Sequence, residues 1–167
     1  MPRPRHRLTA ASGLLAVVLV AACGLVPGVS NQRGVSEHVR ILHGSGGATT
    51  VLLPVTIDRH GPYDFVLDTG ASKSLVASSI ATQLGLPRAG SPEPIQGVGG
   101  VERAQPVRAS SWKTGSIKLP PTVIMSADLP TGRRGGGLQG LLGSDVWDAI
   151  GSFTLDYRTG TLTVNPQ

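Results

Sequence analysis

Residues 65–72 read Phe-Val-Leu-Asp-Thr-Gly-Ala-Ser, an apolar run that ends in an acid. A short apolar run of this kind is typical of a buried strand, so Asp68 is expected where the strand ends. Thr69 and Gly70 follow at once, and glycine permits a tight turn that another main chain can approach closely. Aspartate is also common in ordinary turns, so the flanking sequence has to decide between a site and a plain turn.

The segments around this stretch are typical of short β-strands separated by glycine and proline. Residues 51–57 are predicted to be a strand, residues 59–62 a turn, and residues 63–67 the returning strand that ends at the acid. Near the other end, apolar residues alternate with polar ones over 153–164, on both sides of a turn at 158–160. This alternation predicts a terminal hairpin, and the chain as a whole is predicted to be mainly β.

Two segments are predicted to be short helices. The first includes Ser79, has apolar residues one turn apart, and meets a glycine at Gly85, where a helix commonly ends. The second follows Ser144, carries an apolar stripe with Trp147, and is expected to end at Gly151.

The order of these motifs resembles that of bacterial retropepsin-like aspartic proteases. After D-T-G-A-S, the chain has L-G-L at 84–86, G-V-G-G at 97–100 and G-L-L-G at 140–143, then Asp145 and the terminal hairpin. The resemblance covers roughly residues 48 to 165, and the combination of these motifs is more specific than D-T-G alone. It implies a mainly β fold, a closed β-barrel lobe with one or two short helices, and aspartic endopeptidase activity.

The resemblance also implies roles for individual residues. Asp68 matches the catalytic acid, Thr69 the hydroxyl that braces two active-site loops, and Gly70 the residue that leaves room for a substrate backbone. Ser72 matches a hydrogen-bonding supporter of the loop. Two further segments match the strand beside the catalytic loop and the mobile flap; they are Leu141, Leu142 and Gly143, and Gly97, Val98, Gly99 and Gly100.

One position departs from the retroviral pattern. Retroviral members frequently follow the later glycine with arginine and then aspartate or asparagine, whereas this chain has Ser144 and Asp145. The arginine that bridges the interface in such members therefore has no counterpart here.

A single D-T-G predicts a homodimer. Attack of water on an amide carbonyl needs a general base and a general acid together, and one carboxylate does not supply both. Two close carboxylates do not readily both ionise, so a pair shares one proton and provides both forms. Because the chain has one such motif, a symmetric second copy is expected to supply the other Asp68. The expected partners are thus a peptide or protein substrate and a second copy of the chain.

Composition excludes several other classes. The only cysteine is Cys23, so neither a disulfide within the chain nor a thiolate metal site is possible. The histidines show no metal-ligand spacing, and we expect no metal and no cofactor. Nucleic-acid binding is not expected, because aromatic residues make up 4% of the chain and the 15 basic residues, against 10 acidic ones, form no cluster.

The N-terminus predicts a processed lipoprotein. Arginines at 3, 5 and 7 precede an apolar stretch at 14–22, and Val20-Ala21-Ala22-Cys23 resembles the lipobox of bacterial lipoproteins. This implies a lipid on Cys23 and an extracytoplasmic protein anchored to the cell membrane. The alternative, an uncleaved membrane anchor over 14–26, is well short of the ~20 residues needed to span a bilayer.

The predicted organisation has three parts. Residues 1–22 are a lipoprotein signal peptide, residues 23–47 the lipidated cysteine and a flexible linker rich in glycine and serine, and residues 48–167 the protease domain. Two functions stay open: an aspartic endopeptidase, and a non-catalytic peptide-binding lipoprotein that retains the fold.

Overall fold

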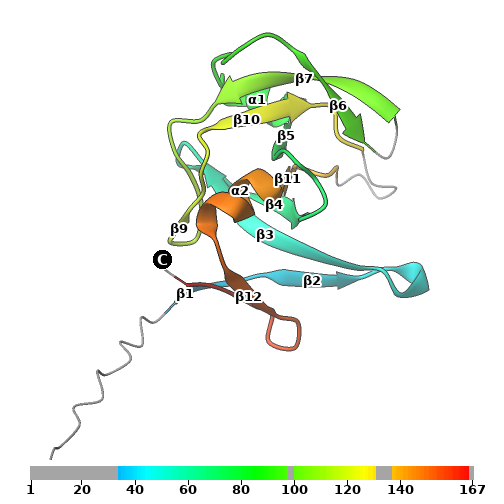
Figure 1. The fold of residues 1–167 in the computed structure, drawn as a ribbon, viewed down its shortest axis with the longest axis vertical. Coiled ribbons are helices and arrows are strands. Elements are labelled where there is room, and N and C mark those ends of the chain that lie inside the picture. The colour runs from blue at the N-terminus through cyan, green and yellow to red at the C-terminus, as the bar shows by residue number, and fades with distance from the viewer. Residues whose placement is uncertain (1–33, 98–99, 131–136, 166–167) are drawn as a thin grey trace, which may run out of the picture. The chain divides into compact units, whose positions relative to one another are not determined.

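A long antiparallel hairpin, β3 (Thr49–Ile57) and β4 (His60–Leu67), leads to Asp68 (Figure 1). In this computed structural model, residues 34–97, 100–130 and 137–165 are described. Leu53, Val55 and Phe65 are fully buried, because alternate side chains of a strand face the same side. The predicted strands are confirmed, but the turn is shorter than expected and is centred on residues 58 and 59, which both have positive φ.

The hairpin belongs to a ten-stranded sheet that positions the acid. Its strand order is β6-β7-β10-β5-β11-β4-β3-β8-β9, with β2 paired to β3. The remaining strands are β2 (Arg40–His43), β5 (Leu75–Ala77), β6 (Glu93–Gly97), β7 (Gly100–Arg108), β8 (Trp112–Thr114), β9 (Ile117–Lys118), β10 (Val123–Ala127) and β11 (Gly140–Leu142). Because β11 runs parallel to β4, with Leu142 opposite Leu67, two segments distant in sequence end side by side at Asp68.

A large hydrophobic core packs against most of the sheet. It takes side chains from strands throughout the sheet, from both helices and from the terminal hairpin. The rings of Phe65 and Trp112 lie 6.3 Å apart, and the indole of Trp112 donates to the carbonyl of Pro121 at 2.8 Å. Burying an aromatic side chain of this kind contributes roughly 1.5–3 kcal/mol, so the core fixes the strand that carries Asp68.

Both predicted helices are present, and the mainly β fold with two short helices is confirmed. They are α1 (Ser78–Gln83) and α2 (Ser144–Ile150). Gly85 and Gly151 follow them with φ of 60° and 91°, a backbone conformation that glycine adopts without strain. Neither helix has a side-chain cap, so packing of their apolar faces into the core holds them in place.

The terminal hairpin is also confirmed, as β12 (Phe153–Asp156) and β13 (Thr161–Val164). The other neighbour of β13 is β1 (Val35–His38), which completes a three-stranded sheet. The prediction of a flexible linker is wrong for residues 34–47, because β1 and β2 lie there, followed by the 3-10 turn η1 (Ser45–Gly47).

Of the two strands in this segment, β1 depends on a distant partner, whereas β2 forms a hairpin with the strand that follows it. β1 pairs with β13 more than a hundred residues later, and β2 pairs with β3. Val39, between them, is buried and donates its N–H to the carbonyl of Gly160 at 2.8 Å. The alternation of Val39 and Ile41 with charged residues was the local signal, but glycine and serine nearby obscured it. The folded domain therefore begins before residue 48.

The predicted signal peptide, Cys23 and the start of the linker lie outside the described residues. Among the described residues, no helix has the length and apolar character needed to cross a membrane.

Candidate active site

Asp68 lies directly after β4, in a turn that is held by its own backbone and by β11. Its N–H donates to the carbonyl of Leu142 at 3.0 Å, which extends the pairing of β4 with β11 by one residue. The N–H of Gly70 donates to Oδ1 of Asp68 at 3.0 Å, and the N–H of Ala71 donates to its carbonyl at 3.2 Å. The Asp68 side chain is half-buried, while Thr69 and Gly70 are exposed. The turn therefore holds the carboxylate in place and leaves the two following residues accessible.

A second segment, made of Gly143 and the first turn of α2, packs against this turn. The N–H of Ser144 donates to the carbonyl of Ala71 at 2.7 Å. Gly143 lies so close that an added Cβ would be 2.6 Å from the backbone carbon of Lys73 and 2.9 Å from the carbonyl oxygen of Ala71. Only glycine fits there without moving the loop that follows Asp68. Residues 141–143, predicted to pack beside that loop, do lie there; Leu142 is fully buried and Leu141 is half-exposed.

A buried hydrogen-bond network joins the loop after Asp68 to this second segment. Ser74 is fully buried; its Oγ donates to Oδ1 of Asp145 at 2.7 Å, and its N–H donates to Oδ2 of the same carboxylate at 3.0 Å. The Oγ of Ser74 also accepts the N–H of Gly143 at 2.9 Å. Asp145 accepts its own helix's Val146 N–H as well, at the positive end of α2. One carboxylate thus fixes both segments.

A serine other than the predicted one makes the hydrogen bonds of this network. Ser72, which the motif predicted as the hydrogen-bonding supporter, is exposed, whereas Ser74 is buried in the network. The sequence contained a signal for Asp145, an acid in the first turn of a predicted helix, but not for its partner. Ser74 turns inward because Gly143 and Asp145 lie against this part of the loop and bond to it.

The candidate flap lies at the tip of the β6–β7 hairpin, at one edge of the large sheet (Figure 1). Gly97 and Gly100 are paired across the hairpin, while Val98 and Gly99 are outside the described residues. Most of β6 is exposed, and Ile95 packs against a small cluster of Ala104, Met125 and Ala127. The hairpin is therefore attached at its base and has few packing contacts along its length.

The described residues contain no group of three or more His, Cys, Asp or Glu side chains placed to hold a metal ion. The turn after β4 presents the carboxylate of Asp68, whose Oδ1 accepts the N–H of Gly70.

Comparison with known proteins identifies the family. The family model described as "Aspartyl protease" matches residues 53–146, which include Asp68, Ser74 and Gly143. Among solved structures, the chain is similar to the crystal structure of a retropepsin-like aspartic protease from Rickettsia conorii. The TM-score is 0.50 and the identity 18%, with 80% of this chain and 96% of that chain covered, so this likeness concerns the fold.

No curated protein sequence matches the chain. The family match spans more than half of the chain and the fold agrees with it, so the chain belongs to the aspartyl protease family and has a retropepsin-like domain.

Proposed function

We propose that this protein is an aspartic endopeptidase that works as a homodimer, with the Asp68 side chains of two copies as its catalytic pair. One observation carries the proposal: a half-buried carboxylate is held on a turn by Leu142 and Gly70, and the residues directly beside it are exposed. An aspartate that only shapes a turn does not require a separate segment to hold that turn, whereas here the N–H of Ser144 bonds to the carbonyl of Ala71. Family membership supports the same chemistry.

In the proposed reaction, the two carboxylates share one proton. The ionised Asp68 removes a proton from water while the oxygen of that water bonds to the scissile carbonyl carbon, and the protonated Asp68 donates to the carbonyl oxygen. The tetrahedral intermediate collapses when its hydroxyl proton returns to a carboxylate and the amide nitrogen takes up a proton. The C–N bond breaks, and the products are a carboxylic acid and an amine.

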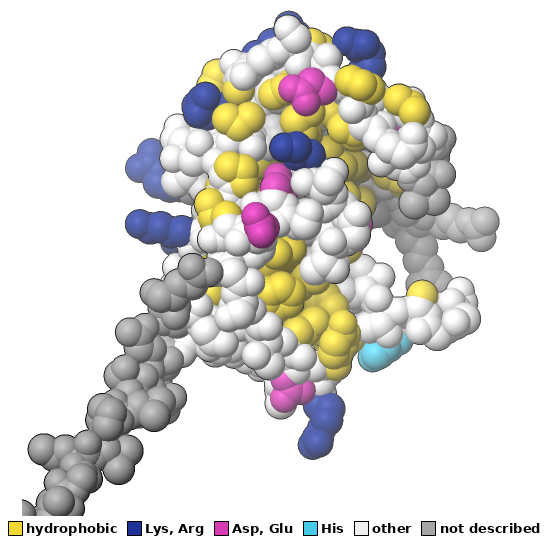
Figure 2. Space-filling view, viewed as in Figure 1, with side chains coloured by type: hydrophobic (Ala, Val, Ile, Leu, Met, Phe, Trp, Pro, Cys, Tyr) yellow, Lys and Arg dark blue, Asp and Glu magenta, His cyan; other side chains and the backbone are white. Residues whose placement is uncertain are grey.

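A second copy is required because one chain supplies one such carboxylate. The exposed Thr69 and Gly70 leave the turn open to a symmetric partner. A second feature supports association: β12 is an edge of the three-stranded sheet and carries the half-exposed Phe153 and Leu155. Figure 2 shows hydrophobic side chains gathered around the terminal hairpin on that face. An unpaired edge with apolar side chains favours pairing with another chain.

The test compares the full chain, purified in mild detergent, with its Asp68→Asn variant. The wild type should cleave members of a library of unstructured decapeptides at mildly acidic pH. The variant should lose at least about 100-fold in kcat/KM, because the neutral amide removes the general base. Sedimentation of the same samples should show that the active species is a dimer. Equal turnover by both proteins would reject the proposal, and peptide binding without cleavage by the wild type would favour the peptide-binding alternative.

We also propose that the protein is an extracytoplasmic lipoprotein, anchored to the cell membrane through Cys23. The support is the sequence Val20-Ala21-Ala22-Cys23 after an apolar segment with arginines before it. Cells that express the chain should incorporate labelled palmitate into it, and Cys23→Ser should abolish the label. Persistence of the label in this variant would contradict the lipobox assignment.

A further inference from the structure

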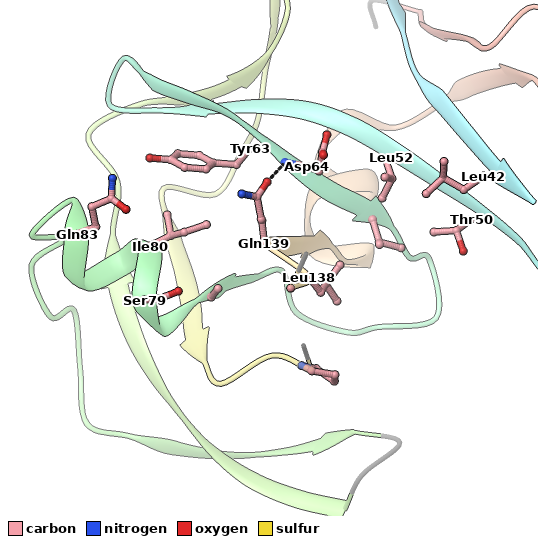
Figure 3. A pocket seen from close by; sticks show the side chains of 14 residues that line it. Leu42, Thr50, Leu52, Tyr63, Asp64, Ser79, Ile80, Gln83, Leu138 and Gln139 are labelled. Carbon is pink, nitrogen blue, oxygen red and sulfur yellow. Dashed lines mark hydrogen bonds between the residues drawn. The ribbon is translucent and has the colours of Figure 1, made fainter. Parts of the chain in front are cut away.

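A groove of about 770 Å³ lies along the strand that leads to Asp68, and it does not include that residue. Its labelled side chains come from β2, β3, β4 and α1 and from the segment before β11 (Figure 3). Apolar side chains from four separate segments meet there: Leu42, Leu52, Val66 and Leu138.

The groove lies within reach of a substrate at Asp68. Asp64 and Val66 both line it, and alternate residues of β4 share a face. Val66 precedes Asp68 by two residues, which corresponds to about 7 Å along a strand. A peptide bound in extended form at Asp68 therefore reaches the groove about two to four residues from the bond that is cleaved.

The outer wall of the groove belongs to the β2–β3 hairpin. The strand registers place Leu52 beside Val66, and Leu42 beside Thr50, so this wall continues the face of β4 sideways. Leu42 and Leu52 precede residue 53, where the match to the family model begins. Leu42 is 47% exposed, so its apolar side chain is accessible at this wall of the groove.

Two of the polar residues at the groove, Asp64 and Gln139, are bonded within the chain. Gln139 Oε1 accepts the N–H of Asp64 at 2.6 Å, shown as a dashed line in Figure 3. The carboxylate of Asp64 forms a salt bridge with Arg40, so its charge is balanced within the chain. The other polar side chains of the lining, those of Thr50, Tyr63, Ser79 and Gln83, are uncharged. A ligand side chain that enters beside Leu42 and Leu52 therefore meets apolar surface and no uncompensated charge.

We propose that this groove binds an apolar side chain of the substrate, about two to four residues from the cleaved bond, and that Leu42 determines the preference. The inference rests on the proposed function, because Asp68 defines where the peptide lies. Each copy of a homodimer supplies one groove, so the preference should occur on both sides of the bond.

The first experiment uses the full chain and one decapeptide that it cleaves, remade with Leu or Ser at each position two to four residues from the cleaved bond. For the wild type, Leu should raise kcat/KM over Ser about tenfold at one or more of these positions, the size expected for an apolar contact. Leu42→Ser should reduce this ratio to about threefold or less, because the wall loses its apolar surface.

Tyr157→Ser is the matched control, because Tyr157 is 58% exposed, lies outside the groove and should leave the ratio unchanged. A wild type without preference at any position would overturn the inference, as would a preference that survives Leu42→Ser.

The second experiment separates this inference from the proposed function. Binding of the same Leu and Ser peptides, carrying a fluorescent label, is measured by anisotropy on the Asp68→Asn variant and on that variant with Leu42→Ser. The Leu peptide should bind about five- to tenfold more tightly to the first protein and lose this advantage on the second. If the wild type cleaves nothing but this difference appears, the proposed function fails and the groove stands. If cleavage depends on Asp68 but the two peptides bind equally, the groove inference alone fails.

Discussion

Asp68 and Asp156 both end a strand and begin a turn, but their carboxylates are held differently. Asp156 closes β12, and its Oδ1 accepts the N–H groups of Arg158 at 2.8 Å and Thr159 at 3.2 Å. Its own turn thus occupies that oxygen twice, and the side chain is exposed to solvent. Asp68 accepts one N–H, from Gly70, and is half-buried.

The difference lies in what surrounds each turn. The Asp68 turn is bonded to a second segment from the far end of the chain, through Ser144, Ser74 and Asp145. An aspartate that only shapes a turn is satisfied by local amides. The Asp68 turn is instead held by a separate, buried network, which supports the proposed catalytic role of its carboxylate. Asp156 therefore serves as an internal control for the proposed role of Asp68.

The largest expected effect tests this comparison directly. Asp156→Asn should leave kcat/KM within about twofold of wild type, whereas Asp68→Asn should lower it at least about 100-fold, because in the proposed reaction only the Asp68 carboxylate transfers protons. The measurement is kcat/KM on one cleaved decapeptide for the three full-length proteins. Comparable losses in both variants would show that the assay reports folding and not the catalytic carboxylate.

The second prediction concerns the clamp on the Asp68 turn. Gly143→Ala should lower the free energy of unfolding by about 3 kcal/mol, because the new Cβ meets backbone atoms of Lys73 and Ala71 that have no room to move. Gly97→Ala is the control; the nearest atom to its Cβ would be the Gly100 oxygen at 3.9 Å, so we expect a change within ~0.5 kcal/mol. Urea unfolding followed by circular dichroism measures both. Similar losses of unfolding free energy in both variants would mean that the close approach of Gly143 to Lys73 and Ala71 does not require glycine.

The third prediction separates the two serines of the catalytic loop. Ser74→Ala leaves the buried N–H of Gly143 without its acceptor and removes one donor from Asp145, so it should cost about 2 kcal/mol. Ser72→Ala, at an exposed position, should stay within ~0.5 kcal/mol. The same urea titrations apply. A larger loss of unfolding free energy for Ser72→Ala than for Ser74→Ala would favour Ser72, the residue that the motif indicated, as the supporter of the loop.

The smallest effect concerns the turn at Asp156. The backbone N–H groups of Arg158 and Thr159 hold the pKa of Asp156 below its ordinary value, and burial opposes this only weakly. A folded-state pKa below the unfolded one contributes stability that is present above the unfolded pKa and is lost as pH falls through the folded one. NMR titration of the carboxyl carbon should show this low pKa. Asp156→Asn should remove a small part of the acid dependence of unfolding; an ordinary pKa would contradict the hydrogen bonding of the turn.

Local patterns were sufficient for much of the fold. The hairpin that leads to Asp68, the two helices with their exits at Gly85 and Gly151, and the terminal hairpin were all predicted. Each depends on neighbours within a few residues: alternation for strands, one-turn spacing for helices, and glycine where φ is positive. The motif order also predicted that residues 141–143 lie beside the catalytic loop.

Other features were not visible in the sequence. β1 forms because the distant strand β13 pairs with it, and Ser74, not Ser72, is bonded to Gly143 and Asp145, which lie far along the chain. The groove joins Leu42, Val66 and Leu138, which share no local pattern.

The sequence by itself determined the acid, the turn that displays it and the family. Only the tertiary structure decided which groups brace that acid and which surface lies beside it, because hydrogen bonds and packing between distant segments depend on the path of the whole chain.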